Sequence, residues 1–347
     1  MTAITASLRG AIPRRRTATY RWAGWICSLV LLTALVFLSI AVGSKDIAFG
    51  QVLGALTHPG TTDQDLVVTT LRVPRTVLGL LVGSALGIAG ALIQAFTRNP
   101  LADPGILGVN SGSALAVSIG VAFFGLSDIT QYLWLALAGA IVTTVVVYAI
   151  GTLGRPGATP VRLTLAGVGV AAVFSGVTSA ITLTRPNAFR SMLGWSAGSL
   201  TGPPLSTSAL IAPFVVVGLV IALAITRNLN ALALGDDLAA SLGGRATRTR
   251  ALSVVSVTLL AGAATAAAGP IGFVGLMIPH VARRITGPDQ RWIFAYSLTL
   301  GPCLLLASDV IGRIVMRPSE LPVGIVTAFV GAPVLVLLAR RTKASGL

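Results

Sequence analysis

Long apolar runs alternate with short polar segments along almost the whole chain. Ten runs are candidate membrane spans, at residues 22–43, 71–97, 105–124, 130–153, 162–183, 208–226, 250–268, 271–284, 291–312 and 322–339. A transmembrane helix needs about 20 consecutive apolar residues, and only the eighth run is clearly shorter than that. The pattern therefore predicts an all-α polytopic membrane protein with ten transmembrane helices.

The placement of basic residues decides whether the short eighth run crosses the membrane. Lys and Arg concentrate in cytoplasmic segments, and a ten-span chain with its N-terminus inside puts 18 of the 25 basic residues there. Without the eighth span the division becomes 14 inside and 11 outside. Ten spans with both termini in the cytoplasm are favoured. The seven basic residues left outside are Lys45, Arg72, Arg75, Arg185, Arg190, Arg313 and Arg317.

This topology divides the chain into three parts. Residues 1–21 form a basic cytoplasmic segment, 22–341 a membrane domain, and 342–347 a cytoplasmic tail. The first apolar run is too long for the core of a signal peptide and lacks a convincing cleavage site, so we expect a retained span.

Composition agrees with a membrane protein and excludes other classes. Hydrophobic residues make up 54% of the chain and charged residues 10%, with a mean hydropathy of +0.88. These values exclude a soluble globular domain and a disordered chain. The net charge of +15 would suit nucleic-acid binding, but the arginines are spread over loops between spans, so topology explains them. We therefore expect no nucleic-acid partner.

Enzymatic chemistry lacks the residues it would need. Only ten Asp and Glu residues exist, and no HExxH or intramembrane carboxylate pair is found. A Walker A loop needs GK[ST], whereas the only lysines are Lys45 and Lys343. We expect no enzyme activity, no cofactor and no metal site, and any ATP must be hydrolysed by another subunit.

Two of the spans resemble each other. Residues 80–93 and 259–272 match at six of fourteen aligned positions. The first span of this pair runs inward and the other outward, so a genuine repeat would be inverted, as in many transporters. Chance similarity in Ala- and Gly-rich sequence is the alternative.

The longest cytoplasmic connection, 227–250, is predicted to hold short helices outside the membrane. Asn230 is placed to cap one helical turn and Asp236 or Asp237 another, with Gly235 between them. Four leucines there, at 232, 234, 238 and 242, would be poorly covered. The pattern alone leaves two interpretations open: a partner-binding surface or an interfacial helix on membrane lipid.

Four stretches together resemble the FecCD-type permeases. They are RVPR…GIAGALIQAFTRNPLADPGILGVNSG from residue 72, LALGDDLAASLG in the long cytoplasmic loop, GPIGFVGLMIPHVARRITG at 269–287, and SELPVGIVTAFVGAPVLVLL at 319–338. Such proteins are membrane subunits of ATP-binding-cassette (ABC) importers for iron-siderophores, haem and cobalamin. The resemblance implies a type II importer fold of ten spans with an inverted repeat, in the bacterial cytoplasmic membrane. It also implies three partners: a second permease subunit, a cytoplasmic ATPase dimer and an extracytoplasmic substrate-binding protein.

The same resemblance implies a docking site on the outer face. Arg72, Arg75 and Arg313 match family arginines that pair with acidic residues of the binding protein. Arginine suits bidentate carboxylate recognition, and these three lie on the side where basic residues are disfavoured. For Arg313 the alternative is an ion pair with Asp309, one helical turn earlier.

A cytoplasmic gate and a coupling surface follow from the resemblance as well. Asn99 and Leu101 match the family's constricting loop, for which a plain turn between helices is the alternative. Thr159 and Pro160 occupy the second gate element, where family members tend to have small hydroxylated residues. The coupling helices, at about 230–243, include Leu234, Gly235, Asp236, Asp237 and Leu238. In this setting a protein partner becomes the favoured interpretation of the loop, although the acidic pair could simply cap a helix.

Function then follows as a hypothesis: a permease subunit that imports a ferric siderophore, with haem or cobalamin as alternative cargo. An ion-coupled secondary transporter is the competing class. Such transporters usually carry ionisable groups at mid-membrane, and this chain offers only Asp309 and Arg313 near one end of a span. His280 stands apart from any cysteine or carboxylate cluster, so we expect a hydrogen-bonded structural histidine rather than a metal ligand.

Overall fold

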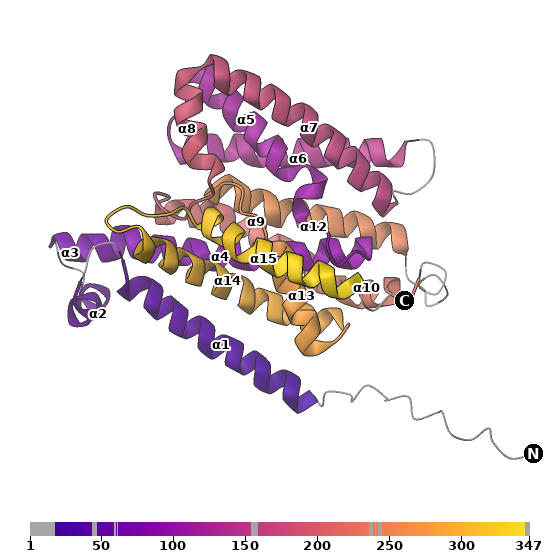
Figure 1. The fold of residues 1–347 in the computed structure, drawn as a ribbon, viewed down its shortest axis with the longest axis horizontal. Helices are drawn as coiled ribbons and strands as arrows, with labels where there is room; N and C mark the ends of the chain where they lie inside the picture. Colours follow the sequence, from indigo (N-terminus) through magenta and orange to yellow (C-terminus); the bar gives the residue numbers. More distant parts are fainter. Residues whose placement is uncertain are drawn as a thin grey trace, which may run out of the picture.

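The computed structural model describes residues 18–43, 47–58, 60, 62–153, 159–235, 239, 241 and 245–343. The regular secondary structure of this described part is entirely helical (Figure 1). The ten predicted spans coincide with ten helices: α1 (Ala18–Ala41), α4 (Val73–Thr97), α5 (Val109–Phe124), α6 (Ile129–Thr152), α7 (Pro160–Thr184), α9 (Leu205–Ala224), α12 (Ala246–Ala268), α13 (Val274–Thr286), α14 (Gln290–Val315) and α15 (Val323–Lys343). The predicted all-α membrane architecture is confirmed.

Not all ten helices have full membrane length. Within the described residues, seven are long and apolar enough to cross a bilayer alone, and α5 and the apolar part of α15 are shorter. Helix α13 has 13 residues, about 20 Å at 1.5 Å per residue, against a hydrocarbon core of about 30 Å. Residues 269–273 precede it without helical structure, so the helical part of the eighth run is shorter than a full membrane span.

Within the residues that the structure describes, six shorter helical segments with defined bounds connect the spans. They are α2 (Phe49–Thr57), α3 (Asp63–Leu66), the π-helical η1 (Val67–Arg72), the 3₁₀ turn η2 (Pro104–Leu107), α8 (Pro186–Ser196) and α10 (Thr226–Leu232). The span pattern does not predict α8, yet its sequence carries a helical signal. Pro186 stands in the first turn, and Ala188, Met192 and Trp195 are buried along one face.

The two ends of the helical bundle are distinct in Figure 1. Helices α2, α3 and α8 lie at one end, which we call the α8 end. Helix α1 begins and α15 ends at the opposite end, close to α10, which we call the α10 end. Hydrogen bonds agree with this view, because the hydroxyl of Tyr296, near the start of α14, donates to the carbonyl of Arg21 at 2.8 Å. The described ends of the first and last spans therefore lie on the same side.

Helices α4 and α12 form the centre of the bundle. The apolar segment of each is 78% buried, more than that of any other long span among the described residues. They pack against each other and run in opposite directions, since α4 begins at the α8 end, where α12 finishes (Figure 1). These are the helices that carry the predicted repeat, so their antiparallel arrangement is the one an inverted repeat requires.

Glycine allows the central helices to approach closely. A Cβ atom on Gly90 would lie 1.8 Å from the carbonyl oxygen of Gly275 in α13, and one on Gly83 would lie 2.5 Å from the Cα of Pro302 in α14. Helices in lipid associate largely through such packing, because the hydrophobic effect does not drive them together there. The small residues of α4 thus fix the positions of α13 and α14.

Candidate functional site

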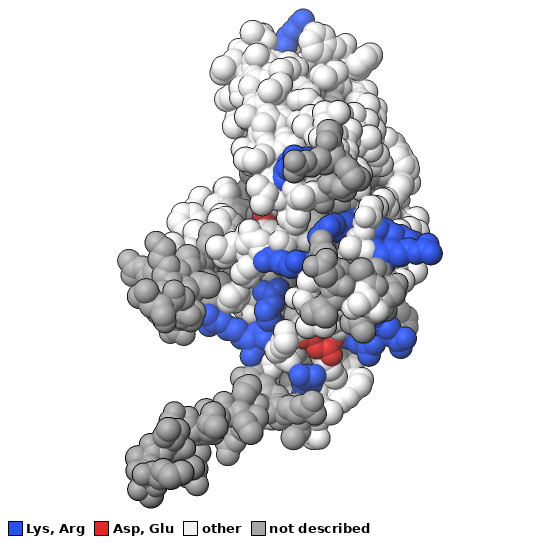
Figure 2. Space-filling model, turned by 90° about the vertical axis from the view of Figure 1, so that its right-hand side faces the viewer, with Lys and Arg blue, Asp and Glu red and all other residues white. Residues whose placement is uncertain are grey.

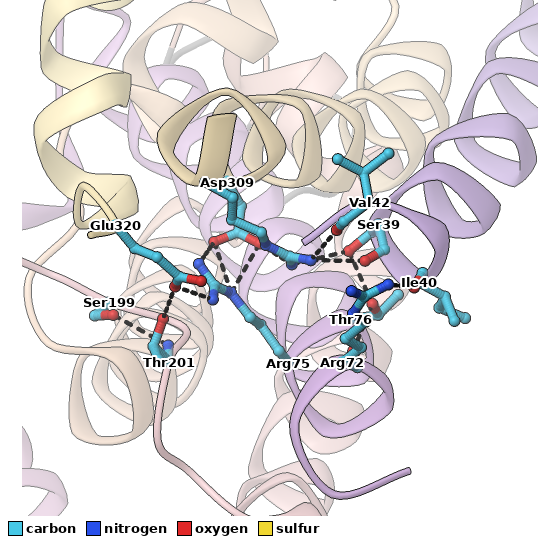
Figure 3. Close-up of polar contacts among 11 residues, drawn as sticks. Ser39, Ile40, Val42, Arg72, Arg75, Thr76, Ser199, Thr201, Asp309 and Glu320 are labelled. Atoms are coloured by element: carbon cyan, nitrogen blue, oxygen red, sulfur yellow. Dashed lines mark hydrogen bonds and ion pairs between the residues drawn. The ribbon is translucent and has the colours of Figure 1, made fainter. Parts of the chain in front are cut away.

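A buried ion cluster joins three helices at the α8 end. The Nε of Arg75, in α4, donates to both carboxylate oxygens of Asp309, in α14, at 2.9 and 3.0 Å, and its Nη2 donates to Oδ1 at 2.6 Å. Arg313, one turn beyond Asp309, also donates to this carboxylate. The Asp309 side chain has no exposed surface. One carboxylate therefore binds two guanidinium groups inside the protein (Figure 3).

Arg313 and a third arginine, Arg72, secure the end of α1. Nη1 of Arg313 donates to the carbonyls of Ser39 and Val42 at 2.7 and 2.9 Å, and Nη1 of Arg72 donates to the carbonyls of Ile40 and Ala41 at 2.9 and 2.6 Å. The last carbonyls of a helix lack partners within it and carry partial negative charge. The cluster thus holds the end of α1 against α4 and α14.

These contacts bear on the predicted docking arginines. Arg72, Arg75 and Arg313 are 4%, 7% and 1% exposed, so they do not project as free surface cations. The alternative for Arg313, an ion pair with Asp309, is confirmed. The three arginines nevertheless line one depression of about 90 Å³ at the α8 end, and docking through it stays a prediction.

Glu320 is a member of this cluster that the sequence interpretation missed. Its Oε2 lies 2.5 Å from Nη1 of Arg75 and accepts a hydrogen bond of 3.4 Å from the hydroxyl of Thr201. It also lines the depression. One signal could have drawn attention to it: Glu320 is the only glutamate in the chain.

The predicted gate loop is a compact turn between α4 and α5. Arg98 ends α4 with a φ of 52°, and the side-chain oxygen of Asn99 accepts a hydrogen bond from the backbone N–H of Leu101 at 3.0 Å. Asp103 then caps η2 by accepting from the N–H of Gly105 at 2.8 Å. Burial raises the pKa of the Asp103 carboxyl, and this hydrogen bond opposes part of the shift.

The gate loop faces two other helices. Pro100 and Leu101 border a narrow crevice with Leu276, Met277 and His280 of α13 and with Gly331 and Val334 of α15. The second predicted element lies at the start of α7, where Thr159 is the N-cap residue and Pro160 occupies the first turn. Helix α7 contacts η2 through Gly167, because a Cβ there would lie 1.7 Å from the carbonyl oxygen of Ile106. The gating role of all four residues stays a prediction.

The predicted coupling segment is described only in part. Leu234 is 62% exposed and Gly235 has a φ of 119°, while Asp236, Asp237 and Leu238 lie outside the described residues. The expected exposure of Leu232 is wrong, since it is 2% exposed. Asn230 does not cap a helix, because it lies inside α10. Its side chain instead bonds Asp289 and the N–H of Gln290, both at 2.9 Å, and so fixes α10 to the start of α14.

The described residues contain no group of three or more His, Cys, Asp or Glu side chains that could hold a metal ion. The expectation of a hydrogen-bonded His280 is wrong, since neither ring nitrogen has a hydrogen-bond partner among those residues. The half-buried His280 lines the crevice beside the gate loop, together with mostly apolar residues.

Sequence comparisons relate the chain to known permeases. Residues 31–341 match the FecCD transport family. FepD, a ferric enterobactin transport system permease protein of Escherichia coli K12, is 45% identical over 92% of this chain and 95% of its own length. The cobalamin import system permease protein BtuC of Halobacterium salinarum is 36% identical over 92% of this chain and 90% of its own length.

A solved structure supports the same relationship. An inward-facing ABC transporter of the metal-chelate type superimposes with a TM-score of 0.80 at 25% identity, covering 92% of this chain and 99% of that one. Family, relatives and fold agree over nearly the full length of the sequence. The chain belongs to the FecCD transport family and is an integral membrane protein with the fold of an ABC transporter permease.

Proposed function

We propose that this chain is the membrane subunit of an ABC importer that carries a ferric siderophore into a bacterial cell. The observation that carries the proposal is the 45% identity to a ferric enterobactin permease over almost the whole chain. The energy comes from a separate ATPase, because the sequence has no Walker A loop. Haem and cobalamin are the alternative cargoes, and the similarity to a cobalamin permease keeps the latter in view.

In this proposal the α10 end faces the cytoplasm. Figure 2 views that end of the molecule and shows many Lys and Arg side chains with few acidic ones. Basic residues favour the cytoplasmic side, so residues 1–21 and the tail 342–347 would be cytoplasmic and the permease domain would span 22–341. The membrane concerned would be the cytoplasmic membrane.

The α8 end then faces an extracytoplasmic binding protein. The depression lined by Arg72, Arg75 and Arg313 supports docking there, because buried guanidinium groups hold carboxylates with defined geometry. A carboxylate of the binding protein would enter the depression from outside. The cluster beneath it connects that contact to α1, α4 and α14.

At the α10 end, an ATPase dimer would bind the connection between α10 and α12. Leu234 supports this role, since its side chain is largely exposed beside a glycine in the left-handed region. The adjacent residues Asp236, Asp237 and Leu238 would complete the contact. Asn99 and Leu101, with Thr159 and Pro160, would form the cytoplasmic gate that this ATPase opens.

A second permease subunit would cover part of the lateral surface, and lipid the rest. Helix α7 supports this assignment because only 6% of its apolar segment is buried within the chain, with Leu165, Val168 and Val173 all more than half exposed. The second subunit is either another copy of this chain or a related permease, and its surface would pack on α7.

The test is transport by the reconstituted complex. Proteoliposomes containing this permease, its ATPase and its binding protein should accumulate a radiolabelled ferric siderophore only with ATP inside the compartment that represents the cytoplasm. Haem and cyanocobalamin serve as competing cargoes. Undiminished uptake with a hydrolysis-deficient ATPase would refute the importer mechanism, and uptake of cobalamin instead of the ferric chelate would change only the assigned cargo.

A further inference from the structure

The two carboxylates that bind Arg75 are held very differently. Asp309 accepts hydrogen bonds from the Nε and Nη2 edge of Arg75 and from Arg313, and its side chain has no exposed surface. Glu320 contacts only Nη1, and its side chain is 25% exposed. Figure 3 shows Asp309 and Glu320 both reaching the guanidinium group of Arg75. Asp309 is therefore a fully enclosed counter-ion, whereas Glu320 reaches Arg75 and Thr201 from a position at the surface.

The backbone around Glu320 also differs from that around Asp309. Asp309 lies inside α14, while Glu320 belongs to the connection between α14 and α15. A carboxylate on such a connection can leave its partner without breaking a helix. Water can also solvate the partly exposed Glu320 carboxylate when it leaves Arg75, whereas the Asp309 side chain has no exposed surface. Release of Glu320 therefore costs little compared with release of Asp309.

The charges of the cluster define what could replace Glu320. Asp309 and Glu320 together balance Arg75 and Arg313. When Glu320 leaves, one positive charge is uncompensated beside the depression, and another carboxylate restores the balance. The depression of about 90 Å³ is roughly three times the volume that a water molecule occupies in the liquid, which is enough for a carboxylate group.

We propose that Glu320 is a displaceable internal occupant of a carboxylate-binding site on Arg75, and that an acidic side chain of the binding protein takes its place on docking. This inference rests on the proposed docking role of the α8 end. The exchange is balanced in charge, so the guanidinium group remains paired throughout. In the absence of the partner, Glu320 keeps the site occupied and lowers its affinity for other anions.

Displacement of Glu320 would also affect the connection between α14 and α15. Glu320 lies three residues before Val323, the first residue of α15. At the start of this helix the N–H of Gly324 donates to the carbonyl of Gly198 at 2.9 Å, and the hydroxyl of Thr201 donates to Glu320 itself. Displacement of Glu320 thus loosens the α14–α15 connection from both α4 and the 198–201 segment. Docking is in this way linked to the beginning of α15.

The experiment measures binding-protein affinity for the assembled importer in nanodiscs, by biolayer interferometry at low and physiological salt. Glu320→Gln removes the competing charge but retains the size of the side chain. We expect binding about two- to fivefold tighter, the scale of a lost partly exposed ion pair. Asp63→Asn is the matched control, because it removes an exposed negative charge in α3 without touching Arg75. It should change affinity less than twofold.

Arg75→Lys separates this proposal from the docking proposal beneath it. Lysine retains the positive charge for Asp309 but lacks the planar guanidinium group that binds two carboxylates at once. The binding protein should therefore bind more weakly to the Arg75→Lys importer. Adding Glu320→Gln to that variant should no longer strengthen the binding. If Arg75→Lys weakens binding while Glu320→Gln has the same effect as Asp63→Asn, the exchange is refuted and docking stands. If Arg75→Lys, shown to be folded by its melting temperature, leaves affinity unchanged, docking at Arg75 itself is refuted.

Discussion

Replacing Asp309 with asparagine tests how the buried cluster stabilises the bundle. The carboxylate accepts hydrogen bonds from Arg75 and Arg313 and has no exposed surface. Asparagine keeps nearly the same shape but loses the charge and offers one acceptor oxygen in place of two. Its amide N–H groups would face guanidinium donors. Two buried cations would then be left without their shared counter-ion.

The expected loss can be estimated from this geometry. Removing one partner of a buried ion pair costs about 3–5 kcal/mol, mostly because the remaining charge stays buried. The lower part of that range applies, about 3 kcal/mol, because Glu320 still pairs with Arg75 and carbonyls of α1 still bind Arg313. At roughly 2 °C per kcal/mol for a chain of this size, the melting temperature should fall by about 6 °C.

The protein supplies its own reporter for the measurement. Cys303 is buried in α14 and Cys27 is exposed, so a Cys27→Ala background leaves a single thiol that reacts only when α14 separates from its neighbours. A thiol-reactive fluorogenic dye, followed during heating in detergent, gives the melting temperature of both variants. Asp63→Asn provides the control for charge removal at the same end.

The double variant Asp309→Asn, Arg313→Gln makes the test sharper. If the two residues act as a pair, the loss in the double variant should be smaller than the sum of the single losses. A melting temperature for Asp309→Asn within 1 °C of the Asp63→Asn control would refute the reasoning, because a buried carboxylate that binds two guanidinium groups cannot be removed at so small a cost.

Three further predictions concern packing, coupling and the gate. Gly90→Ala should prevent a stable bundle, because the added Cβ would lie 1.8 Å from the backbone oxygen of Gly275. Membrane yield and melting temperature measure this effect. Gly176→Ala is the control and should behave as wild type, because a Cβ at Gly176 would have nothing within 4 Å. Leu234→Ser should reduce co-purification of the ATPase at least severalfold without changing the melting temperature, because the leucine is exposed at the α10 end. The control is Leu183→Ser, at a leucine that is 79% exposed near the end of α7. An equal loss of ATPase from this control would contradict a local contact at Leu234. Asn99→Ala removes the acceptor for the Leu101 N–H, a bond of about 0.5–1.5 kcal/mol. It should increase ATP-independent leakage of a ferric chelate from loaded proteoliposomes, and an unchanged leak would remove Asn99 from the gate.

The sequence was sufficient for the spans because their signal is local. A run of about 20 apolar residues must form a helix in lipid, since its backbone groups have no other hydrogen-bond partners there. A helix, α13, is present at the short eighth run as well, and its crossing of the membrane stays a prediction from the distribution of arginines. Helix α8 was missed because it lies outside the spans and its amphipathic pattern is brief. Leu232 was misjudged because its burial depends on helices distant in sequence.

What the sequence by itself determined about this protein was its class, the positions of its apolar helices and the residues that resemble a transport family. Only the tertiary structure decided which charges meet. Arg75, Asp309 and Glu320 are separated by up to 245 positions, and no periodicity connects them. They come together because α4 and α14 pack through glycine in opposite directions. Two arginines that the sequence placed on an outer face, Arg75 and Arg313, are therefore buried and bind Asp309, and Arg75 also binds Glu320 near the surface.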